Sequence, residues 1–347
     1  MKAVVLEGER SVSVSDVPDA TLPGPDGAVV KVEKTGICGS DLHLYHLTMG
    51  GQGVRLGHEF IGTITDVGAD VHTVRAGDRV LVSGVIGCGR CVACLARDPS
   101  VCRKGGTRVF GTTLDLPGGQ AEAVGVPAAD SAMLKIPEKV TDEQAVLLTD
   151  ILPTGFLGAR MADIKPGASV VVIGCGPVGL MALRCVSLFG AGRVLAVDMV
   201  PERRARAEAL GAEPVDPADG GTPAQIMART NGWGAEAVIE AVGADQTILD
   251  AIMCAAPGAT VAVIGANMNL ALPIPMALLF FKRLTLRSTL ASVPSTWDAL
   301  VPLVSSARIQ PDEVFTHKMG LSEAAEAYRM FDAREDGVGK VLLDPAR

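Results

Sequence analysis

Four of the chain's eight cysteines lie within fifteen positions, at Cys88, Cys91, Cys94 and Cys102. Four thiolates on one short loop can complete a tetrahedral shell around a zinc ion and leave no open position for a substrate. Because metal-bound thiolates do not act as nucleophiles, this spacing predicts a structural zinc site. A reducible disulfide pair or idle thiols would be the alternative, which a reducing cytosol disfavours.

A second set of possible metal ligands is scattered along the chain. Cys38 lies in GICGSDLH, His58 and Glu59 lie in LGHEF, and Asp150 lies in LLTDILPTG. No local spacing links these residues, so by themselves they are candidates only. A lone cysteine or histidine is more often part of a hydrophobic core than a metal ligand.

A glycine pattern points to a different chemistry. Gly174, Gly176 and Gly179 form Gly-x-Gly-x-x-Gly directly after a strand-like run and at the start of a helix-like run. Glycines in this context let the backbone turn and approach a pyrophosphate, which binds at the helix N-terminus. The pattern therefore predicts a dinucleotide site that includes Pro177 and Val178 of the same loop. An ordinary tight turn is the alternative.

The next strand-like run favours NAD over NADP. It ends in Asp198, nineteen residues after Gly179, where a carboxylate accepts hydrogen bonds from a ribose 2′-hydroxyl and repels a 2′-phosphate. Arg203 could instead reach a 2′-phosphate or contact the ribose. Gly265 and Ala266, which end and follow the strand-like run ATVAVIG, are further predicted cofactor contacts.

The elements that must position these residues fall into three stretches. Up to about residue 150 the chain has short β-branched runs separated by Gly, Pro and Asp, a pattern typical of an antiparallel barrel or sandwich. From about 168 to 288, apolar runs alternate with segments of helical length, which predicts parallel βαβ units. The last stretch holds helical pieces and the strand-like KVLLD.

Composition narrows the function classes. At 347 residues the chain is long enough for two domains, and its net charge of −8 argues against binding to nucleic acid. The N-terminal apolar run is too short for a signal peptide, and no apolar stretch reaches the ~20 residues of a membrane helix. We therefore expect a cytoplasmic protein that acts on a small molecule, with no nucleic-acid or membrane partner.

Five motifs occur in a familiar order: GICGSDLHLYH, LGHEFIGTITDVG, AGDRVLV, the four-cysteine loop and VIGCGPVGL. Over essentially the whole length, the chain resembles the zinc-containing medium-chain alcohol dehydrogenase family. The resemblance implies an α/β plus β fold, in which a GroES-like β-rich catalytic domain accompanies a Rossmann domain with a doubly wound parallel sheet. The expected domains are residues 1–151, residues 152–289 for the Rossmann domain, and residues 290–347 returning to the catalytic domain.

The resemblance also gives roles to the scattered ligands. Cys38 and His58 match two ligands of a catalytic zinc, and Glu59 matches the neighbouring glutamate that can approach the metal. Asp150 stands where many members have a second cysteine, a departure that resembles the bacterial secondary-alcohol dehydrogenases. One thiolate and one carboxylate neutralise Zn²⁺ as two thiolates would. Whether Glu59 coordinates the metal stays open.

Residues around these ligands match the family's proton relay. The resemblance implies that the hydroxyl of Ser40 takes the substrate proton and passes it through the cofactor ribose to His43 and solvent. Asp41 resembles the carboxylate that orients a zinc-bound histidine. A helix N-terminus capped by Ser40 or Asp41 is an alternative that is compatible with these roles.

Four more positions are carried over from the resemblance. Thr154 matches a residue beside the nicotinamide, and Lys340 matches one that reaches the pyrophosphate, although a solvated surface lysine is an alternative for it. Gly84 and Leu290 are expected to line the substrate pocket together with Ser40, and the missing side chain of Gly84 would leave room for a larger substrate.

These expectations describe a reversible NAD-dependent alcohol dehydrogenase with one catalytic and one structural zinc ion per chain, which acts on a secondary alcohol or the matching ketone. A polyol or amino-alcohol dehydrogenase is the alternative within the same family. A nucleic-acid-binding zinc module and an NAD-binding sensor without catalysis are alternatives from other classes. We expect a homotetramer, with a dimer as the other option. The physiological substrate and the preferred direction stay open.

Overall fold

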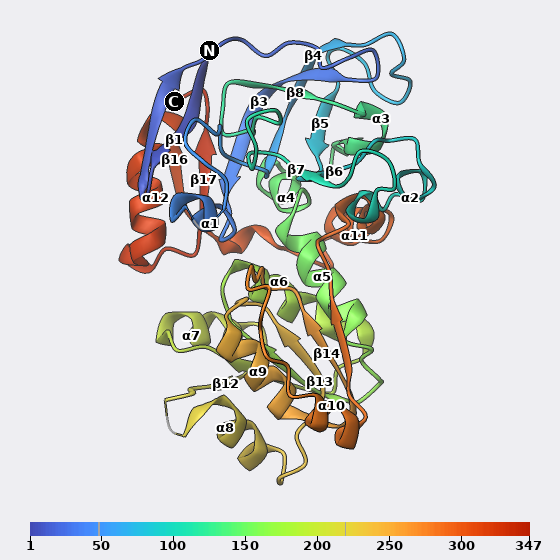
Figure 1. The fold of residues 1–347 in the computed structure, drawn as a ribbon, viewed down its shortest axis with the longest axis vertical. Coiled ribbons are helices and arrows are strands. Elements are labelled where there is room, and N and C mark those ends of the chain that lie inside the picture. The colour runs from blue at the N-terminus through green and yellow to red at the C-terminus, as the bar shows by residue number, and fades with distance from the viewer. Residues whose placement is uncertain (48, 219) are drawn as a thin grey trace. The chain divides into compact units, whose positions relative to one another are not determined.

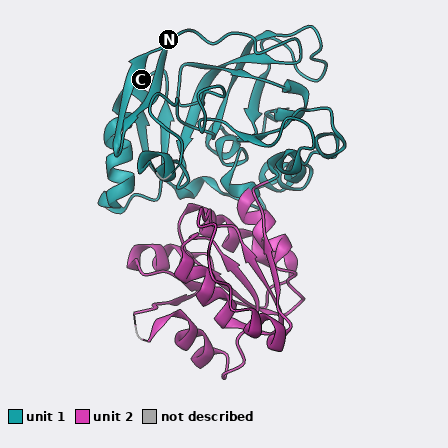
Figure 2. Ribbon diagram, in the orientation of Figure 1, with its two compact units in different colours: residues 1–153, 292–347 teal, residues 154–291 magenta. Residues whose placement is uncertain are grey.

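The chain folds as two units (Figure 2). Unit 1 contains Met1–Pro153 and Ser292–Arg347, and unit 2 contains Thr154–Ala291. Helix α5, Ile151–Met161, carries the chain from the first unit into the second. The computed structural model describes residues 1–47, 49–218 and 220–347.

Unit 1 is built on a largely antiparallel sheet (Figure 1). Among the described residues, its strands lie in the order β16-β17-β3-β4-β5-β9, and β8 also pairs with β3. Only β16 and β17 run parallel to each other. The strands are β3 (Ala28–Ile37), β4 (Phe60–Val67), β5 (Arg79–Val82), β8 (Ala123–Val126), β9 (Met133–Lys135), β16 (Phe315–Gly320) and β17 (Lys340–Asp344).

Apolar side chains that alternate along these strands form the core of the sheet. Val30 and Val32 of β3 are buried with Val80 of β5 in one hydrophobic cluster, as expected where one face of a strand packs inward. In the same cluster the rings of Phe60 and Phe110 meet edge to face at 5.3 Å. The strand-like runs predicted from the sequence thus supply the buried face.

The C-terminal segment is part of this sheet. Strand β17 pairs antiparallel with β3, with Val341 opposite Ile37 and Leu343 opposite Thr35. The pairing places Lys340 beside the end of β3 that leads to Cys38. The remaining elements of unit 1 are β1 (Lys2–Gly8), β2 (Ser11–Asp16), β6 (Val85–Ile86), β7 (Arg108–Val109), α1 (Asp41–Tyr45), α2 (Val92–Leu95), α3 (Ala129–Ala132), α4 (Asp142–Leu147), α11 (Trp297–Ser305) and α12 (Ala324–Ala333).

Unit 2 has the predicted doubly wound parallel sheet. Within the described residues its strand order is β12-β11-β10-β13-β14-β15, and every pairing is parallel. Its elements are β10 (Ser169–Ile173), β11 (Arg193–Val197), β12 (Glu213–Val215), β13 (Ala235–Glu240), β14 (Ala255–Val263), β15 (Thr285–Ser288), α6 (Pro177–Val186), α7 (Pro201–Ala209), α8 (Gly221–Arg229), α9 (Asp245–Cys254) and α10 (Met276–Lys282).

Local signals explain several boundaries in unit 2. Helix α7 begins at Pro201, whose fixed φ suits a first helical turn, and Gly211 follows its end with φ +86°. The sequence did not predict β12, because a three-residue strand that contains Pro214 has little signal of its own. In the part of the chain that the structure describes, we find no helix with the length and apolar character to cross a membrane.

Candidate functional site

The four cysteines of the loop converge in unit 1. Their sulfurs lie 3.5 Å apart between Cys91 and Cys94, and 4.0 Å apart between Cys88 and Cys94 and between Cys91 and Cys102. Tetrahedral zinc–sulfur bonds place sulfurs about 3.8 Å apart. All four are free thiols, and their spacing fits a metal shell without rearrangement of the loop.

The backbone of this loop favours thiolates. The amide of Cys88 donates to the sulfur of Cys102 at 3.3 Å, and the amide of Arg103 donates to the sulfur of Cys91 at 3.4 Å. Backbone donors from Cys94 and Arg103 lower the pKa of the Cys91 thiol to about 6. Since metals bind the deprotonated form, this donor set is suited to zinc.

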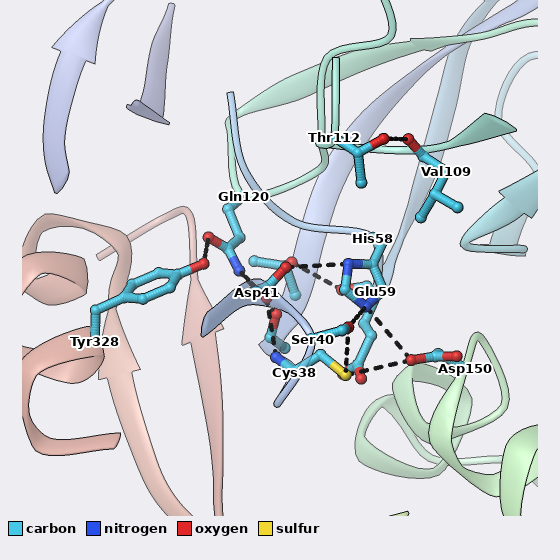
Figure 3. Close-up of polar contacts among 12 residues, drawn as sticks. Cys38, Ser40, Asp41, His58, Glu59, Val109, Thr112, Gln120, Asp150 and Tyr328 are labelled. Carbon is cyan, nitrogen blue, oxygen red and sulfur yellow. Dashed lines mark hydrogen bonds and ion pairs between the residues drawn. The ribbon is translucent and has the colours of Figure 1, made fainter. Parts of the chain in front are cut away.

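The scattered candidates also converge (Figure 3). Cys38 follows β3, His58 and Glu59 precede β4, and Asp150 precedes α5, so three elements of unit 1 bring the four side chains together. The carboxylate oxygen Oδ2 of Asp150 lies 3.4 Å from the sulfur of Cys38 and 3.4 Å from Nε2 of His58. Ligands of one tetrahedral zinc ion are about 3.4–3.6 Å apart, so these donors fit a zinc ion.

A buried carboxylate supports two of these donors. Oδ2 of Asp41 accepts the backbone N–H of Cys38 at 3.0 Å, and Oδ1 lies 3.1 Å from Nδ1 of His58. Burial lowers the pKa of His58, but the charge of Asp41 and the hydrogen bond to Asp150 outweigh it and raise that pKa well above its usual range. The cluster therefore attracts positive charge, which a metal ion would supply.

Glu59 forms a fully buried ion pair with Lys340. The ammonium Nζ of Lys340 lies 2.6 Å and 2.5 Å from the two carboxylate oxygens. Gly36 makes this possible, because a Cβ at that position would overlap Oε2 of Glu59. Burial opposes the charged ammonium, but Glu59 and then Cys38 outweigh it and raise the pKa of Lys340.

This geometry corrects one expectation for Lys340. The alternative of a solvated surface lysine is wrong, because the side chain is fully buried. Its contact with a pyrophosphate stays a prediction, and its ammonium already has a carboxylate partner. No pattern in the sequence points to this pair, since Glu59 and Lys340 are 281 positions apart.

Ser40 points its hydroxyl at the ligand set. Its Oγ lies 3.3 Å from the sulfur of Cys38 and 3.2 Å from Nε2 of His58. Ser40 stands at the N-cap of α1 but makes no side-chain capping bond, so the capping role considered for it is wrong. His43 lies half-buried on α1, and its part in a proton relay stays a prediction.

The structure gives the surroundings of the residues that were predicted to lie near the substrate. A Cβ on Gly84 would lie 2.6 Å from the carbonyl oxygen of His58. The glycine therefore allows close packing against the backbone of His58. The expectation that its missing side chain leaves room for a larger substrate is wrong, because the histidine backbone fills that space. Leu290 is 49% exposed and Thr154 is buried, both in unit 2, and their predicted contacts are untested.

The glycine loop of unit 2 has the geometry expected for a dinucleotide. Gly174 has φ +92°, and α6 begins at Pro177. A Cβ on Gly179 would overlap the carbonyl oxygen of Gly174, whereas one on Gly176 would meet only the guanidinium of Arg203 at 3.8 Å. One glycine therefore serves packing, and the other leaves open space at the helix N-terminus.

Asp198 ties this loop to the next strand. Its Oδ2 accepts the amide of Cys175 and its Oδ1 accepts the amide of Val200, both at 2.8 Å. A guanidinium nitrogen of Arg203 lies 4.0 Å from the same carboxylate. Asp198 therefore has a structural role that sequence reasoning missed, and its contact with a ribose stays a prediction.

A second buried carboxylate of unit 2 was not predicted. Oε1 of Glu240 accepts the amides of Val242 and Gly243, and its backbone oxygen accepts the amide of Gly265. Glu240 thus organises the loop next to the predicted cofactor contacts Gly265 and Ala266. A charged residue within the otherwise apolar run AVIEAV is the signal that could have found it.

Comparisons with known proteins give one answer for the whole chain. Residues 24–138 match the family described as alcohol dehydrogenase GroES-like domain, and residues 177–306 match zinc-binding dehydrogenase. The first match confirms the expected GroES-like fold of the β-rich domain.

Individual relatives agree with these matches. The chain is 47% identical, over 99% of its length and 89% of the relative's, to a probable zinc-binding alcohol dehydrogenase of Mycobacterium tuberculosis. It is 38% identical to an alcohol dehydrogenase from a Thermus species, with a TM-score of 0.92 and 99% of both chains covered. A Sinorhizobium meliloti structure bound to NADP and described as a zinc-binding dehydrogenase is 30% identical, with a TM-score of 0.85 and 99% of each chain covered.

The glycine loop generates a prediction about two alanine variants. Gly179→Ala should lower the free energy of unfolding by about 1–3 kcal/mol, because the added methyl group overpacks the turn. Gly176→Ala should change it by less than about 1 kcal/mol but weaken dinucleotide binding, because the pyrophosphate must approach this backbone. Urea unfolding and a dinucleotide titration would measure the two effects. Equal stability of both variants would contradict this assignment.

The buried ion pair generates a second prediction. Lys340→Met should lower the free energy of unfolding by about 3–5 kcal/mol, because it leaves the carboxylate of Glu59 buried without its partner. The double variant Lys340→Met/Glu59→Gln should recover most of this loss. Chemical unfolding of the metal-free protein would measure both free energies. A Lys340→Met variant as stable as the wild type would show that the ion pair does not contribute to stability.

Proposed function

The chain belongs to the zinc-containing medium-chain dehydrogenase family, and we propose that it is an NAD-dependent dehydrogenase of secondary alcohols. The observation that carries this proposal is the convergence of Cys38, His58 and Asp150 with the hydroxyl of Ser40. Three protein ligands can hold a zinc ion and leave its fourth position for a substrate oxygen. The reverse reaction reduces a ketone or an aldehyde.

Two zinc ions per chain fit the donors. Cys88, Cys91, Cys94 and Cys102 would hold a structural ion, and Cys38, His58 and Asp150 would hold a catalytic one. When bound at the latter site, zinc supplies Lewis-acid polarisation of the substrate oxygen. The thiolate and the carboxylate balance the charge of the ion, so Glu59 is not needed for neutrality and its charge is compensated by Lys340.

The residues around this site have separate tasks. Asp41 holds His58 through Nδ1, which leaves Nε2 directed at the ligand set. Ser40 is free of a capping bond, so its hydroxyl can take the proton of the substrate alcohol while it releases its own proton toward His43. His43, on the same helix, would pass that proton to solvent.

NAD is the proposed hydride acceptor, which would bind at the glycine loop. Asp198 supports NAD, because its carboxylate would repel the 2′-phosphate of NADP. NADP in the similar Sinorhizobium structure and the nearby Arg203 favour the competing choice. A comparison of kcat/KM with NAD and with NADP decides between the two cofactors.

The proposed substrate is a secondary alcohol, because Asp150 stands where many family members have a cysteine, as in the bacterial secondary-alcohol dehydrogenases that the chain resembles. A polyol or amino alcohol is the alternative outcome. We place the protein in the cytoplasm, with a small molecule as its only partner besides further copies of itself.

Self-association is supported by an exposed edge of unit 2. Strand β15 is the outer strand of the parallel sheet, and all four of its residues are exposed. Phe280 and Phe281 of the preceding helix α10 are 76% and 81% exposed. Unpaired strand edges and apolar surface of this kind are suited to pairing with a second copy. We propose a homotetramer that uses this edge, with a dimer as the smaller alternative.

The two metal sites predict different effects of cysteine substitution. Cys38→Ser should lower kcat/KM for secondary alcohols at least about 100-fold, because Lewis-acid stabilisation is worth several kcal/mol, while the fold stays intact. Cys91→Ser should lower the melting temperature and keep turnover per folded molecule. Cys185→Ala, a buried cysteine outside both clusters, is the control. Zinc content and kcat/KM with NAD and NADP would be measured for each protein.

Four outcomes would count against the proposal. Near-normal turnover of Cys38→Ser would remove its catalytic assignment, and a single zinc ion in the wild type would remove the catalytic site. Higher kcat/KM with NADP would reverse the cofactor assignment. Activity confined to polyols or amino alcohols would replace the substrate class.

The exposed edge predicts an assembly defect. Phe280→Asp combined with Phe281→Asp should shift the protein toward smaller assemblies, because charge would be buried at the contact. Trp233→Asp, at a residue that is also exposed and lies outside α10 and β15, should leave the assembly unchanged. Light scattering after size exclusion would measure this, and a monomeric wild type would show that the edge is not used.

A further inference from the structure

A line of buried polar side chains leads from helix α12 to the candidate metal ligands (Figure 3). The hydroxyl of Tyr328 donates to Oε1 of Gln120 at 2.9 Å. Nε2 of Gln120 donates to the carbonyl oxygen of Gly36 at 3.0 Å and to Oδ2 of Asp41 at 3.3 Å. Tyr328, Gln120 and Asp41 are each completely buried, so water cannot replace these contacts.

The line ends on a carboxylate that serves two metal ligands at once. Asp41 accepts the amide of Cys38 through Oδ2 and faces Nδ1 of His58 through Oδ1. A rotation of this carboxylate would disturb the backbone of one ligand and the ring orientation of the other. Its donors therefore control how precisely both ligands are held.

The orientation of the Gln120 amide follows from its neighbours. Gly36 offers a carbonyl oxygen and Asp41 a carboxylate oxygen, and both can only accept, so the NH₂ group must face them. The amide oxygen then faces Tyr328, whose hydroxyl donates to it. Without that hydroxyl, a buried acceptor would lose its partner and the amide would no longer be held in one position.

We propose that Tyr328 and Gln120 are positioning residues for the catalytic metal centre, and that they act through Asp41 on Cys38 and His58. The inference rests on the proposed function, because it assumes a metal ion at these ligands. It assigns helix α12, which supplies no ligand, a part in metal affinity. The hydrogen bonds of their side chains join them to each other, to Gly36 and to Asp41, so their effect on the ligands is on placement.

The packing of Tyr328 allows its hydroxyl to be removed cleanly. Its ring lies in the hydrophobic core of unit 1, 5.4 Å from the ring of Tyr45, and Tyr328→Phe keeps this ring. Tyr45 is a matched control, because it is a buried tyrosine of the same cluster whose hydroxyl takes no part in the line of hydrogen bonds.

The experiment measures zinc affinity at each site by competition with a chelator, on the full-length protein. Cys38→Ser identifies which of the two zinc ions belongs to the catalytic site. Tyr328→Phe should weaken zinc binding there about tenfold, the lower end of the range for outer-shell partners. The four-cysteine site should be unchanged and serves as an internal reference. Tyr45→Phe should leave both affinities as in the wild type.

A second variant separates positioning from a general loss of stability. Gln120→Met keeps the length of the side chain and removes both hydrogen-bonding ends, so it should weaken the same site at least as much. Tyr328→Phe added to Gln120→Met should cause no further loss, because the hydroxyl acts through the amide. The visible spectrum of Co²⁺ bound in place of zinc should shift in both single variants and not in Tyr45→Phe.

Unchanged affinity of the catalytic site in Tyr328→Phe and Gln120→Met would overturn the inference and leave the proposed function standing. Equal losses at both sites, or equal losses in Tyr328→Phe and Tyr45→Phe, would also overturn it, since they would indicate a structural effect only. A wild-type chain that binds zinc only at the four cysteines would overturn the inference and the proposed function together.

Discussion

Three carboxylates lie in the interior of unit 1, at Asp41, Glu59 and Asp150, and each needs a source of positive charge or hydrogen bonds to stay there. Lys340 compensates Glu59, and backbone and amide donors hold Asp41. His58 faces both Asp41 and Asp150, and one imidazolium cannot balance two carboxylates. This imbalance explains why the cluster is suited to a cation and why so many surrounding contacts serve to keep its acceptors in place.

Sites formed by one short segment could be predicted from the sequence more fully than sites formed by residues far apart in it. The four-cysteine loop and the glycine loop could be assigned from residues alone, because both sites are closed by short segments. The set of Cys38, His58 and Asp150 needed a family resemblance, since three separate elements bring it together. The reading of Gly84 failed for the same reason: only the fold shows that the carbonyl oxygen of His58 occupies the space beside it. Gln120 and Tyr328 are 208 positions apart, and no periodicity connects them.

The returning C-terminal segment contacts each element that carries a ligand. Strand β17 brings Lys340 to Glu59, and helix α12 brings Tyr328 to Gln120. At α11, the indole nitrogen of Trp297 donates to the carbonyl oxygen of Leu148 at 3.0 Å, two residues before Asp150. None of these contacts supplies a metal ligand. Together they show that the precision of the site depends on a part of the chain whose sequence has no recognisable metal-binding pattern.

The order of synthesis gives this arrangement a further consequence. A ribosome releases the N-terminal part of a chain first, and domains begin to fold as they emerge. The four-cysteine loop is complete once Cys102 has emerged, so the structural ion proposed for it could bind early. The carboxylate of Glu59 receives its counter-ion only when Lys340 emerges, after the whole of unit 2 has been made. The two proposed metal centres would therefore be completed at different stages of synthesis, and a chain released before its last strand would have all four cysteines of the loop but no counter-ion for Glu59.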